Sequence, residues 1–252
     1  LLFAFCGFAP QAPGAGVVLV KSTLSAPNEA EKNYAQTVTR HLDRWLADIN
    51  VPHTVIDDDK VTAAALGQAR VVILGYNPNL PSAELAELRR FLQRGGRLIV
   101  FYSADPALAS LMNLKLGPCT PASVTGQWSA MRFNESAPPH LPSAVLQESR
   151  ILRPAYPADA SGRVVASWES ATGKPQPEPA WVQTAAGFWM SHVLLDDGDS
   201  WNKRQLLLGL IGACDSSVWE PAAARLLQAA STLDGRFPTF EDAVQRLPEM
   251  GG

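Results

Sequence analysis

The sequence predicts an α/β fold in which a doubly wound, mainly parallel sheet carries helices on both faces. Three short apolar runs, at residues 16–20, 69–75 and 97–102, have the composition of strands that are buried on both sides. Amphipathic stretches with a helical period separate these runs. Strands that alternate with helices at such spacings imply right-handed crossovers between parallel strands. With 252 residues the chain is long enough to bury a substantial core.

The first predicted helix follows the strand at 16–20. Asn28 and Glu31 have the spacing of a capping box, which marks its start. Its apolar residues recur with a helical period and form one core-facing stripe: Tyr34, Val38, Leu42, Trp45, Leu46 and Ile49. A second strand is expected at 52–57 and a short helix at 62–66.

Two further helices flank the strand at 97–102. Ser82 is expected to cap the first of them, which Gly95-Gly96 then stops. Asp105 as N-cap and Pro106 at the first helical position open the second. The strand between them therefore runs into a tight turn and a new helix, the geometry at which many α/β hydrolytic enzymes place their nucleophile.

The second half of the chain differs in composition and in its predicted elements. Residues 118–142 are rich in Pro, Ser and Thr and are expected to form an irregular insertion. Strands are expected at 164–168, 180–184 and 188–194, and residues 185–187 have the length of a hairpin turn. Helices are expected at 203–214, 222–230 and 237–250. We assign residues 16–219 to one α/β domain, and 220–252 to a C-terminal helical extension of a chain expected to continue past Gly252.

The N-terminal residues resemble the end of a secretory signal peptide. Residues 1–9 are apolar and end in a small-x-small pattern, so we interpret 1–15 as a signal remnant and lead-in, and expect export to the periplasm or the extracellular space. The alternative is that these residues are the buried start of the first strand. The apolar run is too short to cross a membrane, and no transmembrane segment is expected. If Cys6 is removed with the signal, Cys119 and Cys214 remain and could pair.

Composition excludes several classes of protein. The net charge is -3, and Lys and Arg are scattered, so we expect no nucleic-acid partner. The cysteines lack CxxC spacing, and metal ligation would require several of the four scattered histidines to converge, so we expect no metal. The loop at 21–27 has no GxGxxG pattern, so we expect no dinucleotide and no other cofactor.

The candidate site lies at the carboxyl edge of the predicted sheet, where open α/β folds bind ligands. We expect Tyr76, Asn77, Tyr102, Ser103 and His192 to line one cleft there and to bind a small polar or carbohydrate ligand. Ser103 and His192 could also be catalytic, with Asp196 or Asp197 orienting the imidazole. The alternative is that Ser103 helps cap the following helix and that His192 is hydrogen-bonded in the wall of a pocket.

Four segments carry a resemblance to a known family. The strand at 69–75, the helix and stop at 88–96, the strand and turn at 97–103, and the strand that ends at His192 together resemble the class I glutamine amidotransferase-like fold. The similarity is to its trehalose-utilisation and β-galactosidase-middle-domain branches, and it implies a flavodoxin-like sheet. Amidotransferases of this class carry a Cys at the turn and a His-x-Glu pair. This chain has Tyr102-Ser103 at the turn and Val193-Leu194 after the histidine. These departures from the family pattern argue against glutamine hydrolysis and favour a non-catalytic domain.

A closer resemblance is to the domain that precedes the barrel in some secreted glycoside-hydrolase-like proteins. It rests on Leu141-Pro142, Ala180-Trp181-Val182, the run at 187–195 and the helix that opens at Trp219-Glu220-Pro221. This resemblance implies a catalytic module in the same chain as a partner.

Three hypotheses for function follow. The preferred one is a non-catalytic, structural or ligand-binding module of an exported, carbohydrate-active protein. The second is a serine hydrolase that uses Ser103 and His192. The third is a protein-interaction domain that docks through residues 118–142 and a hairpin bearing Trp181 and Trp189.

Overall fold

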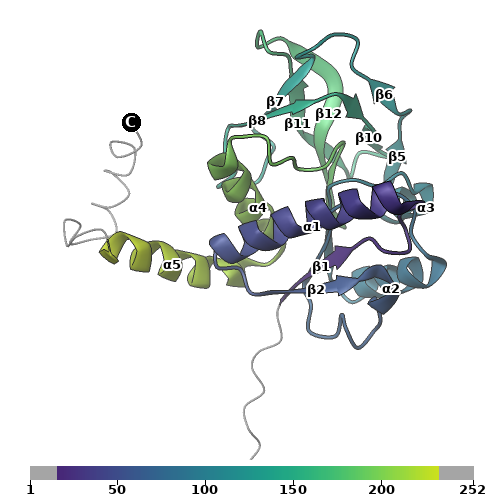
Figure 1. Ribbon diagram of the computed structural model, residues 1–252, viewed down its shortest axis with the longest axis vertical. Coiled ribbons are helices and arrows are strands. Elements are labelled where there is room, and N and C mark those ends of the chain that lie inside the picture. The colour runs from purple at the N-terminus through teal and green to yellow at the C-terminus, as the bar shows by residue number, and fades with distance from the viewer. Residues whose placement is uncertain (1–15, 233–252) are drawn as a thin grey trace, which may run out of the picture.

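The computed structural model describes residues 16–232, which form one large sheet with helices on both faces (Figure 1). The expected signal remnant at 1–15 and the expected helix at 237–250 lie outside the described residues.

Five parallel strands form the first part of the sheet, in the order β2-β1-β3-β4-β13. Their bounds are β1 Val17–Lys21, β2 His53–Asp57, β3 Val71–Leu74, β4 Arg97–Val100 and β13 Gly187–Met190. With β13 counted as the fifth parallel strand, this is the 2-1-3-4-5 order of flavodoxin-like folds. The predicted fold class is confirmed.

Four antiparallel strands extend this sheet in the order β12-β11-β7-β8. Their bounds are β12 Pro175–Thr184, β11 Arg163–Glu169, β7 Trp128–Phe133 and β8 Ala144–Ser149. The expected hairpin turn at 185–187 joins β12 to β13. Residues 118–142, expected to be irregular, contain β7 in the sheet itself. The Pro and Ser residues around β7 made the segment look irregular in the sequence. Pairing with β8 and β11, and not its own composition, sets the register of this short strand.

Two small two-stranded sheets lie beside the main one. They pair β5 Leu114–Leu116 with β10 Ala155–Pro157, and β6 Thr120–Pro121 with β9 Ile151–Leu152. β6 also falls within the segment that was expected to be irregular.

The helices cover the two faces of the sheet in pairs. α1 (Glu29–Asp48) and α4 (Ser200–Cys214) pack on one face, and α2 (Ser82–Gln93) and α3 (Pro106–Leu111) pack on the other. α5 (Trp219–Thr232) extends away from the body of the molecule (Figure 1). The short helix expected at 62–66 is instead a run of turns that follows a 3-10 turn at Asp58–Lys60.

Two of the predicted helix caps form and one does not. Asn28 accepts a hydrogen bond from the amide of Glu31, and Asp105 accepts from the amides of Ala107 and Leu108. Ser82 is instead the first residue of α2, its N-cap is Pro81, and no side chain caps the helix. The preceding proline restricts the local backbone, which starts this helix without a polar cap.

β8 is an outer strand of the sheet, and carboxylates cover part of its free edge. The amide of Leu146 donates to Asp199 Oδ2 at 2.7 Å, and the amide of Glu148 donates to Asp197 Oδ2 at 3.1 Å. The fully buried Lys203 holds this acidic loop by pairing with Asp197 and donating to the carbonyl of Leu195. Unpaired amides on an exposed edge are templates for intermolecular strand pairing, so this loop blocks one route to self-association.

We predict that Asp199→Gly increases self-association. Asp199 has a left-handed backbone with φ of 50°, which glycine adopts without strain, so the change mainly frees the amide of Leu146. Sedimentation velocity over a range of protein concentrations should show a larger average mass than wild type. Asp199→Asn tolerates the same φ and keeps an acceptor oxygen, so it should stay like wild type. Equal behaviour of the two variants would contradict the proposed role of the loop.

Candidate functional site

The loops after β3 and β4 and the end of β13 meet at the carboxyl edge of the parallel strands. The amide of Asn77 donates to the carbonyl of Tyr102 at 3.0 Å, which ties the first two loops together. β13 runs parallel to β4, with Trp189 opposite Val100, so the segment that holds His192 emerges beside Tyr102.

A cavity of about 320 Å³ opens at this edge. We call it the tyrosine cavity. The cavity is lined by α1, the loops after β3 and β4, the loop between β5 and β6, β9 and the segment after β13. The lining residues are Glu31, Tyr34, Tyr76, Tyr102, Cys119, Ile151, Leu152, His192 and Val193. Three of the five residues expected to line one cleft are therefore in its wall, namely Tyr76, Tyr102 and His192.

The three tyrosines form one aromatic group. The rings of Tyr76 and Tyr102 are stacked, with centroids 5.1 Å apart and planes 11° apart. Tyr34 meets Tyr76 edge to face at 5.0 Å. The hydroxyl of Tyr76 donates to the carboxylate of Glu31. Burial first, and then the hydrogen bond and charge of Glu31, raise the pKa of Tyr76, so this phenol stays protonated at neutral pH.

His192 presents a neutral imidazole. Its Nδ1 lies 3.1 Å from the carbonyl oxygen of Val193 and 3.4 Å from Ser149 Oγ. Because a carbonyl only accepts, we place the ring proton on Nδ1, which leaves Nε2 as an acceptor. Burial lowers the pKa of His192 and favours this neutral form. The side chain can therefore accept a hydrogen bond from a ligand hydroxyl.

Ser103 forms no hydrogen bond with His192, and neither does Asp196 or Asp197. Ser103 is 1% exposed, and its Oγ accepts from the amide of Asp105 at 3.1 Å, as in the capping alternative. Asp196 pairs with Arg44 at 2.7 Å and lies 3.6 Å from His41 Nε2. The geometry therefore gives no hydrogen-bonded Ser-His-Asp triad among residues 16–232.

Asn77 is also absent from the wall of the tyrosine cavity. It is 0% exposed, and neither polar atom of its side chain has a hydrogen-bond partner in the described part of the chain. Glu31, Tyr34 and Cys119 line the cavity instead, although sequence reasoning did not place them there. The first two were assigned to a cap and to the core stripe. Their position in the first turns of α1 could have predicted this, because a helix that follows a parallel strand begins at the carboxyl edge of the sheet.

The loop after β1 lies at the same edge but is already filled by the protein. Asp58, which is 2% exposed, accepts hydrogen bonds from the amides of Thr23, Leu24 and Ser25 at 2.8 to 3.0 Å. Amides in such a loop are the usual anion donors of doubly wound folds. Here a carboxylate of the same chain saturates them, which leaves the tyrosine cavity as the candidate site.

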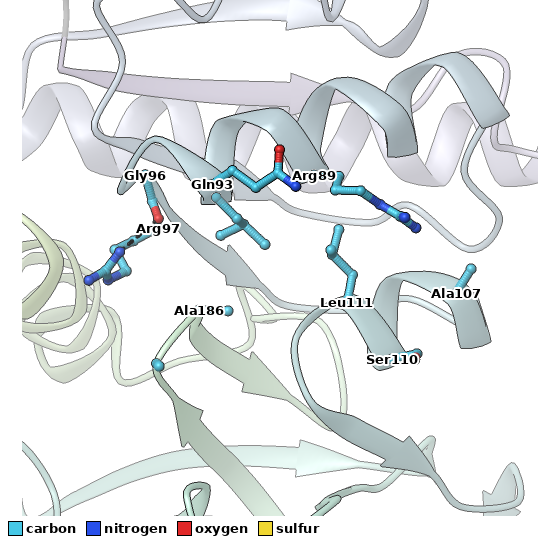
Figure 2. Close-up of a pocket in the computed structure, with 10 residues that line it drawn as sticks. Arg89, Gln93, Gly96, Arg97, Ala107, Ser110, Leu111 and Ala186 are labelled. Carbon is cyan, nitrogen blue, oxygen red and sulfur yellow. Dashed lines mark hydrogen bonds between the residues drawn. The ribbon is translucent and has the colours of Figure 1, made fainter.

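A larger opening of about 640 Å³ lies at the opposite, amino edge of the sheet (Figure 2). Arg89 and Arg97 lie at opposite ends of it, with Gln93 between them. None of the predicted site residues lines this opening. We favour the tyrosine cavity because ligands of open α/β sheets bind at the carboxyl edge, where convergent polar groups are also present.

The other sequence expectations concern cysteines, metals and membranes. Cys119 and Cys214 are both free thiols, so the considered disulfide is not formed. Within residues 16–232 no group of three or more His, Cys, Asp or Glu side chains is arranged to hold a metal ion. No described helix combines the length and apolar character that a membrane span needs. Trp181 and Trp189 are almost completely buried, so the hairpin that bears them offers no aromatic docking surface.

Solved structures share this fold at low sequence identity. A ThuA-like protein from Bacteroides uniformis aligns over 87% of this chain and 100% of its own, with TM-score 0.60 and 15% identity. The β-galactosidase from Bacillus circulans sp. alkalophilus aligns over 80% of this chain, with TM-score 0.59 and 12% identity. A GMP synthase component from Thermoplasma acidophilum aligns over 84% of this chain and 97% of its own, with TM-score 0.51 and 13% identity.

These distant similarities support the amidotransferase-like fold. They do not show what activity this chain has. The chain spans 31% of the length of the β-galactosidase. Neither a protein-family model nor a curated protein matches the sequence.

A buried carboxyl at the same edge, that of Glu84, makes the stability of the fold depend on pH. Glu84 in the first turn of α2 is 1% exposed, and its carboxyl oxygens have no hydrogen-bond partner among the described residues. Burial, followed by the charges of Asp58 and Asp105, raises the pKa of Glu84 from 4.5 to about 8. Between these values the folded protein binds a proton that the unfolded chain has lost, so stability should fall as the pH rises through this range.

We predict that Glu84→Gln removes this loss. The free energy of unfolding of the wild type should decrease between pH 5 and pH 8 by a few kcal/mol, on the order of 4 at most. The variant should show a flatter profile and should be the more stable protein at pH 8. Chemical denaturation at a series of pH values measures both effects, with the exposed Glu135→Gln as control. Parallel pH profiles for wild type and Glu84→Gln would contradict the assignment.

Proposed function

We propose that this chain is a non-catalytic, amidotransferase-like module of an exported, carbohydrate-active protein, and that it binds a small sugar in the tyrosine cavity. The observation that carries the proposal is the pairing of a polar aromatic cavity with a turn that has no free nucleophile. The cavity supplies groups that can bind a ligand. The turn after β4 lacks a nucleophile that could attack it.

The lining residues suit a sugar chemically. Sugars present apolar C–H faces, which pack on aromatic rings, and hydroxyl groups, which need hydrogen-bond partners. Tyr34, Tyr76 and Tyr102 supply the rings and the phenol groups. Glu31 and His192 Nε2 supply acceptors for hydroxyl protons.

The turn after β4 argues against chemistry at Ser103. Its Oγ is buried and already accepts the amide of Asp105, while His192 Nδ1 bonds to other partners. A serine nucleophile needs a base within hydrogen-bond reach, and no such bond is present between these two residues. The serine-hydrolase alternative therefore has no support from this geometry.

The larger context of the module is a further part of the proposal. The β-galactosidase with this fold is about three times as long as the aligned region, which is compatible with a catalytic module elsewhere in the same chain. Export rests on the signal-like composition of residues 1–9.

We predict that Tyr102→Ala weakens sugar binding by about fivefold or more, because it removes one ring of the stacked pair and opens the cavity wall. An aromatic contact of this kind is worth on the order of 1 kcal/mol or more. Isothermal titration calorimetry with a panel of neutral and acidic mono- and disaccharides would measure the change. Tyr156→Ala is the control, because Tyr156 is 40% exposed and lies outside the tyrosine cavity. If no sugar in the panel binds the wild type, the proposed function is wrong.

We also predict that the protein does not hydrolyse esters or glycosides through Ser103. A serine-directed phosphonate should leave Ser103 unlabelled, as judged by intact mass, because its oxygen is buried. Hydrolysis by the wild type that Ser103→Ala abolishes would overturn the non-catalytic proposal in favour of the serine hydrolase.

A further inference from the structure

The wall of the tyrosine cavity carries a negative charge. Of the nine lining residues one is acidic, Glu31, and none is Lys or Arg. His192 is neutral, as described above, and the other lining residues are aromatic, apolar or a thiol. Arg153 follows the lining residue Leu152 in the chain but does not itself line the cavity, so a ligand inside contacts Glu31 and not this arginine. Such a wall favours a cationic ligand over an anionic one.

The carboxylate of Glu31 has a free acceptor. Its Oε2 accepts from the Tyr76 hydroxyl, and no residue in the described part of the chain donates to its Oε1. Glu31 also forms no ion pair within residues 16–232. The other acidic residue in this turn of α1, Glu29, pairs with Lys32 at 2.7 Å. An ammonium group that reaches Glu31 can therefore donate to Oε1 and form a charge-assisted hydrogen bond.

Aromatic rings flank this carboxylate. Glu31 and Tyr34 are three residues apart on α1, so they lie on one face of the helix. The Tyr76 hydroxyl reaches the same carboxylate, and Tyr34 meets the ring of Tyr76 edge to face at 5.0 Å. Tyr102 extends the group by stacking on Tyr76. Because the face of an aromatic ring attracts an ammonium group, these rings add to the preference for a cation.

From these contacts we infer that the tyrosine cavity binds a cationic amino sugar of the hexosamine class, with its ammonium group on Glu31 beside the rings of Tyr34 and Tyr76. The ammonium group donates three N–H bonds and accepts none, which suits the free acceptors Glu31 Oε1 and His192 Nε2. A volume of about 320 Å³ is at the small end for a ligand site and suits a single sugar ring. The inference rests on the proposed function and narrows it, because it names the charge of the sugar and the residue that selects it.

Calorimetric titration of the wild type with glucosamine, glucose and glucuronate at pH 6.5 tests the inference directly. Glucosamine carries a protonated amine at this pH where glucose carries a hydroxyl group. It should bind at least about tenfold more tightly than glucose, a difference of about 1.4 kcal/mol that one hydrogen bond to a charged group supplies. Glucuronate should bind less tightly than glucose. Raising the salt concentration should weaken glucosamine binding and leave glucose binding unchanged.

Glu31→Gln tests the residue that selects the charge. Glutamine keeps an acceptor for the Tyr76 hydroxyl but removes the negative charge, so the ratio of the glucosamine affinity to the glucose affinity should fall to about one. Glu29→Gln is the matched control, because Glu29 lies in the same turn of α1, pairs with Lys32 and does not line the cavity. This control should keep the ratio of the wild type. Thermal unfolding and circular dichroism would verify that each variant is folded.

The outcomes separate this inference from the proposed function. Equal affinities for glucosamine and glucose in the wild type would overturn the inference and leave sugar binding in place. Tighter binding of glucuronate than of glucosamine would overturn the sign of the ligand charge. A preference for glucosamine that persists in Glu31→Gln would overturn the role of Glu31. Absence of binding for every sugar, charged or neutral, would overturn the proposed function itself.

Discussion

Backbone pairing between β4 and β13 joins the two halves of the chain into one sheet, and the position of the candidate site depends on it. Gly187 begins β13 directly opposite Leu98, with φ of 133°, and a Cβ atom there would lie 1.9 Å from the carbonyl oxygen of Leu98. No other residue type fits this close approach without moving the strand. Since β12 pairs with β13, the antiparallel strands β11, β7 and β8 are also anchored through it. The same pairing places His192 at the edge of the sheet where Tyr102 lies in the loop after β4.

Patterns that act over a few residues could be predicted from the sequence, and patterns set by distant neighbours could not. The apolar run of β3, the caps at Asn28 and Asp105, and the β12–β13 hairpin are local, and each forms as expected. β7 was missed because its six residues become a strand only between β8 and β11. Ser82 was predicted as a cap because its type suits one, yet Pro81 occupies that position. Among the site residues, Tyr76, Tyr102 and His192 follow from strand ends, whereas Glu31 was assigned to a cap on spacing alone.

The turn after β4 shows how a scaffold can persist without its nucleophile. Ser103 is held by the amide of Asp105, and Asp105 in turn caps α3 and accepts the amide of Leu80 at 3.0 Å. These bonds fix the turn through backbone groups and a helix cap, none of which requires a reactive side chain. At the neighbouring loop after β1, Asp58 occupies the amides that could have received an external anion. Both places where this fold commonly does chemistry or binds phosphate are therefore satisfied internally, whereas the tyrosine cavity at the same edge stays open.

Charge at this edge of the sheet is distributed unevenly, and that distribution bears on what the tyrosine cavity can bind. Behind the edge, Asp58 is balanced by amide and hydroxyl donors, and the raised pKa of Glu84, about 8, keeps that carboxyl largely protonated at neutral pH. Glu84 therefore adds little negative charge that an incoming anion would feel. At the cavity itself, Glu31 remains without an ionic partner among residues 16–232 and accepts from the Tyr76 hydroxyl. Glu31 is thus the carboxylate in the cavity wall, and together with His192 Nε2 it favours ligands that present hydroxyl donors.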